Sequence, residues 1–159
     1  MSCTIHQNGD EIIFSNIDSL EEAATTATPE NVAQWNGRNL SFDFQLLKSV
    51  NSVAIKSWAE FVAKISGAAS IVYLHCPDEF VVQFSMIPQL ATGVDVKSVI
   101  RNYECLDCGH VQERVLRKGV DFSKDNIPED TTEKCPKCQS DFDPTSPGED
   151  FFEFMNREP

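Results

Sequence analysis

Two short cysteine pairs form the most specific chemical pattern in this sequence. Cys105 and Cys108 are separated by two residues, and Cys135 and Cys138 repeat that spacing after an interval of 26 residues. Two intervening residues allow a tight turn to direct both sulfur atoms toward one point, and two such turns supply four ligands. The pattern therefore predicts a closed four-cysteine metal centre, which is structural because no coordination position is left open for catalysis.

The residues around these cysteines are typical of a zinc ribbon. Gly109 follows the first pair, where a positive φ is often needed, and Pro136 stiffens the second pair. Residues 110–119 alternate as one strand of a hairpin would. Zinc is the expected metal, and the spacing alone leaves tetrathiolate iron open. His110 is an alternative ligand, although its place beside Gly109 is more typical of a turn, and two matched pairs disfavour a redox role for one pair alone.

Acidic residues outnumber basic residues and are unevenly distributed. The 159 residues include 25 Asp and Glu against 13 Lys and Arg, for a formal net charge of −12. Residues 1–100 carry 5 basic and 11 acidic residues, whereas residues 101–140 are nearly balanced at 7 and 8. Phosphate backbones are bound by clustered Lys and Arg. The charge balance thus predicts no nucleic-acid partner, and a nucleic-acid-binding zinc ribbon is retained only as an alternative.

The distribution of apolar residues predicts a cytoplasmic chain that has no membrane partner. The first residues lack a basic start followed by an apolar run, and no segment approaches the roughly 18 apolar residues of a membrane span. Thiols stay reduced in the cytoplasm, so the six cysteines do not suggest a disulfide framework. Cys3 and Cys76 are interpreted as a small terminal thiol and a small buried residue. The sequence leaves the oligomeric state open.

Alternating patterns along residues 1–103 predict the elements that precede the metal centre. Ser19 and Glu22 form a capping-box pattern, Pro29 begins a second helical piece, and Gly37 ends it. The order of strands and helices predicts an α/β fold with a mixed sheet and crossover helices. The expected elements are a hairpin at 4–17, helical pieces within 19–38, a strand at 40–47, a helix within 49–67, a strand at 69–76, a helix at 77–87 and a strand at 94–103.

The last twenty residues are acidic but rich in aromatic side chains. Solvating tails usually lack aromatic residues, so residues 140–159 are expected to form a strap that packs back on the ribbon through a short helix or turn. A docking peptide for a partner is the alternative. The apolar members are Phe142, Phe151, Phe152, Phe154 and Met155.

The segment LSFDFQLLKSV, residues 40–50, runs into NSVAIKSWAEFV, residues 51–62. This strand and helix resemble the central strand and following helix of STAS domains, the fold of anti-sigma-factor antagonists, and PDEFVVQFSMIPQL resembles the helix after the next strand. The resemblance implies a STAS-like domain over residues 1–103, followed by a four-cysteine zinc ribbon with an acidic, Phe-rich strap over residues 104–159.

In STAS domains the strand leads to an acidic-Ser-x-Gly turn whose serine is the phosphorylation site. Here Asn51 replaces the acid and Ala54 replaces the glycine, so the resemblance marks Ser52 as the phosphorylation candidate. It implies a partner-binding surface at Asn51, Ser52 and Lys56, and a protein partner such as a serine kinase or another signalling protein. A simpler interpretation is that Asn51 or Ser52 caps the helix, since both residue types are good N-caps.

The sequence favours a non-enzymatic regulatory or scaffold protein over a small enzyme with a purely structural metal. Its three histidines form no recognisable nucleophile–base pattern, and no glycine-rich phosphate loop is present. His75 beside Cys76 is the one pair to consider. Adjacent residues on a strand point to opposite faces, so a catalytic couple of these two side chains is not expected.

Overall fold

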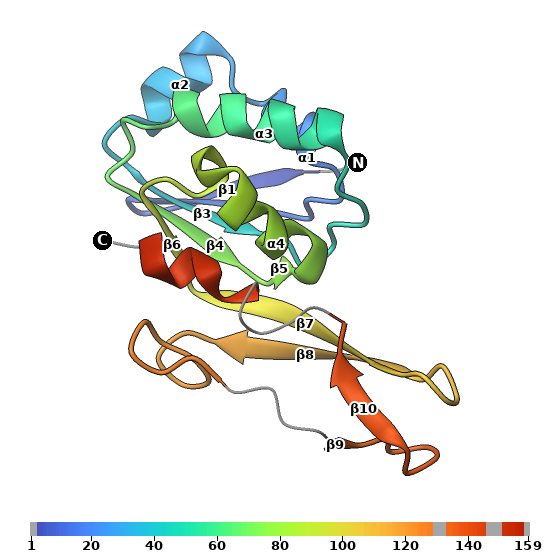
Figure 1. The fold of residues 1–159 in the computed structure, drawn as a ribbon. Helices are drawn as coiled ribbons and strands as arrows, with labels where there is room; N and C mark the ends of the chain where they lie inside the picture. The colour runs from blue at the N-terminus through green and yellow to red at the C-terminus, as the bar shows by residue number, and fades with distance from the viewer. Residues whose placement is uncertain (1–2, 129–132, 146–150, 158–159) are drawn as a thin grey trace.

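The computed structural model of the chain describes residues 3–128, 133–145 and 151–157. Within them the chain forms two five-stranded sheets, and helices α1 to α3 pack along one face of the first sheet (Figure 1). The predicted α/β class with mixed parallel and antiparallel strands is confirmed. Among the helices described, none is both long and apolar enough to cross a lipid bilayer.

The first sheet combines an N-terminal hairpin with parallel strands. β1 pairs antiparallel with β2, and the remaining neighbours in the order β1-β2-β3-β4-β6 are parallel. Parallel neighbours need crossover connections, which the helices provide. The strands are β1 (Thr4–Asn8), β2 (Glu11–Ser15), β3 (Asn39–Asp43), β4 (Ser70–Leu74) and β6 (Val94–Val96).

The helices begin where local sequence signals place them. Ser19, Thr28 and Asn51 each accept a hydrogen bond from the backbone N–H three residues later, at 3.3, 3.2 and 2.9 Å. The predicted cap at Ser19 and the predicted start at Pro29 are confirmed. The helical elements are α1 (Leu20–Ala24), α2 (Pro29–Trp35), α3 (Ser52–Lys64), α4 (Asp78–Met86) and the 3-10 turn η1 (Pro88–Leu90).

An aromatic core joins α3 and α4 to the same face of the first sheet. Tyr73 of β4 is fully buried, and its ring stacks against Phe80 of α4 at a centroid distance of 6.0 Å. Its hydroxyl accepts a hydrogen bond of 2.9 Å from the Trp58 indole of α3 and donates to the backbone carbonyl of Leu90 in η1. One hydroxyl thus satisfies polar groups from two other elements inside an apolar core.

Replacing Tyr73 by Phe should lower the free energy of unfolding by about 1–3 kcal/mol, because the buried Trp58 N–H and Leu90 carbonyl both lose their partner. Urea unfolding followed by tryptophan fluorescence measures this change. In a double-mutant cycle, Trp58→Phe together with Tyr73→Phe should cost less than the sum of the single changes. Equal unfolding midpoints for wild type and Tyr73→Phe would contradict the assignment.

The second sheet contains the ribbon strands. β7 is its central strand: β8 pairs antiparallel along one edge, while β5 and β10 pair along the other. β9 pairs with β10 at the margin. The strands are β5 (Cys76–Pro77), β7 (Ser98–Cys105), β8 (Val111–Arg117), β9 (Glu133–Lys134) and β10 (Asp141–Pro144).

A sharp turn at His75 lies between β4 of the first sheet and β5 of the second. Two of the predicted strands are each divided between the two sheets. His75 has a φ of +52°, and its backbone N–H donates to the Ser98 hydroxyl at 2.8 Å. The predictions of single strands over 69–76 and 94–103 are therefore wrong at these points, because β4 and β6 belong to the first sheet and β5 and β7 to the second. The predicted domain boundary between residues 103 and 104 falls inside β7.

The C-terminal aromatic residues pack mainly on the first part of the chain and not on the ribbon alone. Phe151, Phe152, Phe154 and Met155 are at most 4% exposed and belong to the main core cluster. The Phe154 ring lies 5.9 Å from that of Phe84 in α4. The expected strap that packs back on the ribbon is thus corrected: its last turn, η2 (Glu153–Arg157), lies beside α4.

Candidate metal centre

The structure brings the four predicted cysteine ligands together. Their sulfur atoms all lie within 4.8 Å of one another. The distance is 3.4 Å between the Sγ atoms of Cys105 and Cys138, and 3.6 Å between those of Cys108 and Cys135. Sulfur atoms placed tetrahedrally at about 2.3 Å from a zinc ion would be about 3.8 Å apart. The arrangement therefore fits a four-coordinate metal ion and could hold one.

Two matching turns place the sulfur atoms. In the first turn, the Cys105 N–H donates to the His110 carbonyl and the Gly109 N–H donates back to the Cys105 carbonyl, each at 2.9 Å. The second turn repeats both bonds: the Cys135 N–H donates to the Ser140 carbonyl at 2.7 Å, and the Gln139 N–H donates to the Cys135 carbonyl at 2.9 Å. Each pair of cysteines is thus fixed by its own local backbone bonds.

Pairing between β7 and β10 brings the two turns to one place. The first turn connects β7 to β8, and the second connects β9 to β10. Phe142 of β10 lies opposite Cys105 of β7 in the antiparallel register. Because the turns extend from neighbouring strands of one sheet, they lie at the same end of it (Figure 1), and their sulfur atoms come together there.

A small apolar cluster supports the centre from inside the sheet. It consists of Tyr103, Cys105, Cys135 and Phe142, all at most 9% exposed. The Phe142 ring stacks against that of Tyr103 at 5.8 Å. This cluster is small for a chain segment of its size, so a bound metal would supply folding free energy that packing does not.

Arg114 and His110 complete the surroundings of this cluster. The Arg114 guanidinium lies 4.2 Å from the centre of the Tyr103 ring and pairs with Glu133 at 2.5 Å. This ion pair raises the pKa of Arg114 and lowers that of Glu133. The ring of His110, the alternative ligand, stacks on Phe142 at 5.8 Å, and His110 is not part of the ligand cluster. The alternation of β8 placed Arg114 on a strand, but nothing in the sequence paired it with Glu133.

The electrostatics of the four thiols favour a bound cation. Hydrogen bonds from the backbone and side chain of Ser140 lower the pKa of Cys138 to about 6. The pKa of Cys108 is raised to about 12: the backbone bond from His110 lowers it, but partial desolvation and the neighbouring cysteine sulfurs outweigh that bond. Several thiolates cannot coexist this closely without a cation, and a divalent metal supplies the missing positive charge.

The proposed partner-binding residues lie away from the cysteines, at the start of α3. Asn51 is the N-cap, since its side-chain oxygen accepts the Ala54 N–H at 2.9 Å. Ser52 is the first helical residue and is exposed, as is Lys56 one turn later. The capping interpretation therefore applies to Asn51 and leaves the Ser52 hydroxyl unused by the helix.

The structure pairs His75 with Asp43 and not with Cys76. The Nδ1 atom of His75 lies 2.9 Å from Oδ1 of Asp43, at the adjoining ends of β4 and β3. Cys76 is fully buried; burial raises the pKa of its thiol well above the usual value, and the Asp43 charge raises it further. A buried neutral thiol is a poor nucleophile. Asp43 was not predicted as a partner of His75, because the expected strand over residues 40–47 continues past it, whereas β3 ends at Asp43.

Comparison of the chain with protein-family models, with curated proteins and with solved structures finds no match.

Replacing Cys138 by Ser should weaken metal binding by more than about 100-fold, the upper range for loss of an outer-shell partner, because one of four thiolate ligands is removed. Elemental analysis after passage through a chelator-containing column would measure the change, with one metal ion per chain expected for wild type. Cys3→Ser is the matched control, because Cys3 lies outside the cluster, and it should keep the metal. Full metal content in Cys138→Ser would contradict the assignment.

The two turns have different residues, Gly109 and Gln139, at the position that follows the second cysteine. Gly109 has a φ of +77° and Gln139 has a φ of +66°. A Cβ at Gly109 would meet no atom within 4 Å, so Gly109→Ala should cost about 1 kcal/mol through backbone strain alone. Gln139→Gly should relieve similar strain and raise stability by a smaller amount. Thermal unfolding of the metal-loaded variants measures both, and a loss of stability in Gln139→Gly would contradict the matched-turn interpretation.

Proposed function

We propose that the chain is a non-enzymatic regulatory or scaffold protein that binds a signalling protein through the start of α3. In this proposal residues 1–103 are a STAS-like domain and residues 104–159 are a zinc ribbon. The contact surface is formed by Asn51, Ser52 and Lys56, and phosphorylation of Ser52 switches the contact. By resemblance, the partner is a serine kinase of the anti-sigma type or another signalling protein.

The observation that carries the proposal is the exposure of Ser52 among exposed apolar side chains. Leu46, in the loop that leads into α3, is 53% exposed, and Val53 in the first turn is 61% exposed. The Ser52 hydroxyl makes no hydrogen bond within the described part of the chain. Exposed apolar side chains can contact a protein partner. An exposed hydroxyl near them can be phosphorylated, and the phosphate would then change that contact.

The charge around Ser52 explains how a phosphate would act. The first turn of α3 contains no acidic residue, so the positive end of the helix dipole would tolerate a phosphate there. Nearly two added negative charges next to the exposed Val53 would have to lose water when a partner covers that surface. The phosphate would thus leave the helix intact and weaken the contact.

The four-cysteine centre has a structural role in this proposal. Zinc is the proposed metal, and tetrathiolate iron is the competing assignment, which the visible absorption of ferric thiolates would reveal. Four cysteine ligands leave no open position for a substrate. The ribbon would present a second contact surface beyond the edge of the first sheet, which is supported by the way β7 continues from β6.

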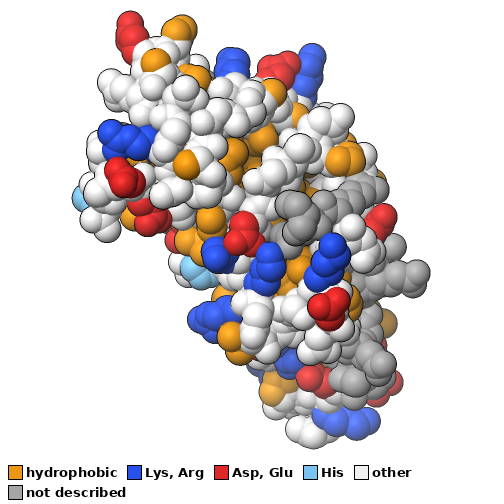
Figure 2. Space-filling view, turned by 90° about the vertical axis from the view of Figure 1, so that its left-hand side faces the viewer, with side chains coloured by type: hydrophobic (Ala, Val, Ile, Leu, Met, Phe, Trp, Pro, Cys, Tyr) orange, Lys and Arg blue, Asp and Glu red, His pale blue; other side chains and the backbone are white. Residues whose placement is uncertain are grey.

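A nucleic-acid-binding ribbon is the second candidate, favoured by one observation. Lys and Arg side chains gather across the middle of one face of the molecule (Figure 2). Several basic residues of the chain are, however, paired with acids: Lys97 and Lys118 with Asp95, at 3.2 and 2.8 Å, and Arg114 with Glu133. Because these charges are already compensated, fewer remain for a phosphate backbone.

Replacing Ser52 by Asp should weaken partner capture by at least about tenfold, because the added charge must be desolvated in the contact. Pull-downs from lysate of the native organism with wild type and Ser52→Asp, followed by mass spectrometry, would compare the captured proteins. An acid in the first turn interacts favourably with the helix dipole, so the fold should be retained.

Ser66→Asp is the matched control, because Ser66 is exposed just beyond the other end of α3. It adds the same charge and should capture the same proteins as wild type. If Ser52→Asp also captures the same set, the switch at Ser52 is rejected. A salt-sensitive shift of labelled DNA or RNA by wild-type protein would instead favour the second candidate.

A further inference from the structure

A cleft lies at the hairpin edge of the first sheet. β1 is the outermost described strand there, and all five of its residues are exposed. Ile5 and Gln7 of β1 lie opposite Phe14 and Ile12 of β2, so their side chains share the face that carries the helices. α2 packs over β2 and leaves a cavity of about 530 Å³ beside β1. This volume is within the usual range of small-molecule sites.

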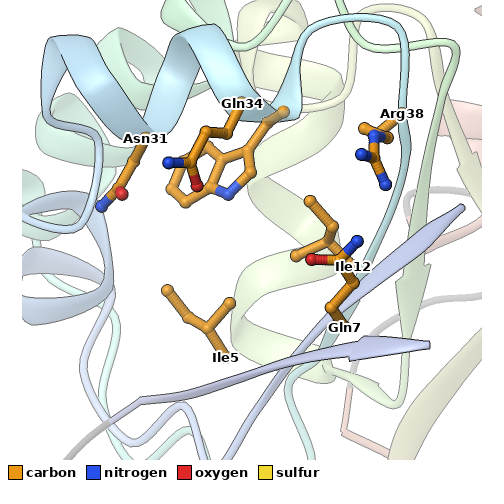
Figure 3. Close-up of a pocket in the computed structure, with 7 residues that line it drawn as sticks. Ile5, Gln7, Ile12, Asn31, Gln34 and Arg38 are labelled. Carbon is orange, nitrogen blue, oxygen red and sulfur yellow. The ribbon is translucent and has the colours of Figure 1, made fainter. Parts of the chain in front are cut away.

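The lining of this cleft is rich in hydrogen-bond donors. The described residues that line it include Arg38 and the side-chain amides of Gln7 and Gln34 but no Asp or Glu, in a chain that has 25 acidic residues. In Figure 3, Gln34 comes from α2, whereas Gln7 and Ile12 come from the hairpin below, and Arg38 extends toward the hairpin. The cleft thus contains several hydrogen-bond donors, whereas the net negative charge of the chain would predict carboxylate acceptors.

The Arg38 guanidinium is only weakly engaged by the protein. Its one hydrogen bond to a residue that the structure describes, to the Gly9 carbonyl, is 3.4 Å long, and Gln7 donates to the same carbonyl at the same distance. Within the described residues, Arg38 has no carboxylate within ion-pair distance. A partly buried guanidinium normally binds an anion or several acceptors. The protein therefore leaves most of its donor capacity unused on the side of the cleft.

Trp35 supplies a second unused donor. Its side chain lines the cleft, and the residue is 4% exposed. In the part of the chain that the structure describes, its indole N–H has no hydrogen-bond acceptor, whereas that of Trp58 is bonded to Tyr73. The Trp35 nitrogen is not among the buried unpaired polar atoms of the described residues, so this N–H is open to solvent although most of the ring is buried. It is therefore available to donate to an acceptor of a molecule bound in the cleft.

We propose that the cleft between β1 and α2 binds a small organic anion. Its carboxylate or phosphate oxygens accept hydrogen bonds from Arg38 and the Trp35 indole, with Gln7 and Gln34 as further donors. Its apolar part contacts Ile5, which is 41% exposed, and Ile12 on the floor of the cleft. A bare inorganic ion would fill little of the cavity, so an organic body is required. The site needs neither the metal nor the Ser52 contact and is independent of the proposed function.

Titration of 15N-labelled protein with three probes tests this proposal. Benzoate and phenyl phosphate carry the two anionic groups on the same ring, and benzyl alcohol is the neutral control. The indole N–H resonance of Trp35 should shift saturably with at least one anion and not with benzyl alcohol. The resonance of Trp58 should stay fixed, because that N–H is bonded inside the core. The anion that binds more tightly identifies the group that the cleft prefers.

Three variants connect the shift to the cleft. Arg38→Gln keeps the backbone bonds of residue 38 and should weaken binding by about tenfold or more, since a charge-assisted bond is lost. Gln34→Glu places a carboxylate on the exposed rim and should weaken it likewise. Lys48→Gln removes an exposed charge outside the lining and should bind as wild type does.

An unchanged Trp58 resonance in each variant would show that the core is intact. The proposal is overturned if neither anion shifts Trp35, if benzyl alcohol shifts it equally, or if Arg38→Gln binds as tightly as wild type.

Discussion

The short parallel pairing of β5 with β7 is the constraint on which the arrangement of the two sheets depends. Only Cys76 and Pro77 pair with Val99 and Ile100. This short pairing nevertheless joins the chain that leaves the first sheet directly to the central strand of the second. The left-handed turn at His75 makes the pairing possible, because it redirects the chain immediately after β4. On the neighbouring strand, the Lys97 N–H donates to the Tyr73 carbonyl at 2.9 Å and holds the corner from the other side. The position of the ribbon thus follows from a few backbone bonds.

Beyond this corner, the ribbon is organised by local geometry and by its sulfur atoms. Its apolar cluster has four members, compared with an extensive aromatic core in the first part of the chain. Within each cysteine turn, backbone hydrogen bonds fix the two sulfur atoms without long-range contacts. The pairing of β7 with β10 then only aligns one turn with the other. A metal ion is therefore the interaction that would connect the two turns most strongly. The net negative charge of the chain does not oppose metal binding, since the four thiolates compensate the positive charge of the metal ion locally.

The features predictable from sequence were those that depend on near neighbours in the chain. Cysteine spacing predicted the sulfur cluster, and Ser19 and Pro29 predicted helix starts, because each signal acts within a few residues. The ends of β4 and β6 were not predictable, because an apolar run such as residues 69–76 contains no sign that His75 will adopt a positive φ. The choice between Asn51 and Ser52 as the cap was also open, since both residue types suit that position.

Long-range contacts account for the rest of what the sequence did not reveal. The pairings of Asp43 with His75 and of Arg114 with Glu133 join residues from different strands, and neither has a spacing signature. The cleft between β1 and α2 likewise depends on how far one helix extends over a sheet. The aromatic tail was expected to pack on the ribbon. Phe142 does so, whereas Phe154 contacts Phe84 of α4 as well as Phe122.

The burial of the C-terminal aromatic residues in the main core has a consequence for how the chain is made. A ribosome releases residues 1–103 well before these side chains exist, so the nascent chain emerges with part of its core surface still uncovered. Phe84 and Phe122 would lack their contacts with Phe154 and Phe152 until residues 152–154 leave the exit tunnel. Folding during synthesis is therefore completed late, after the ribbon has emerged and its thiols have become available to metal. The residues of this segment that are synthesised last are thus also the last to complete the core.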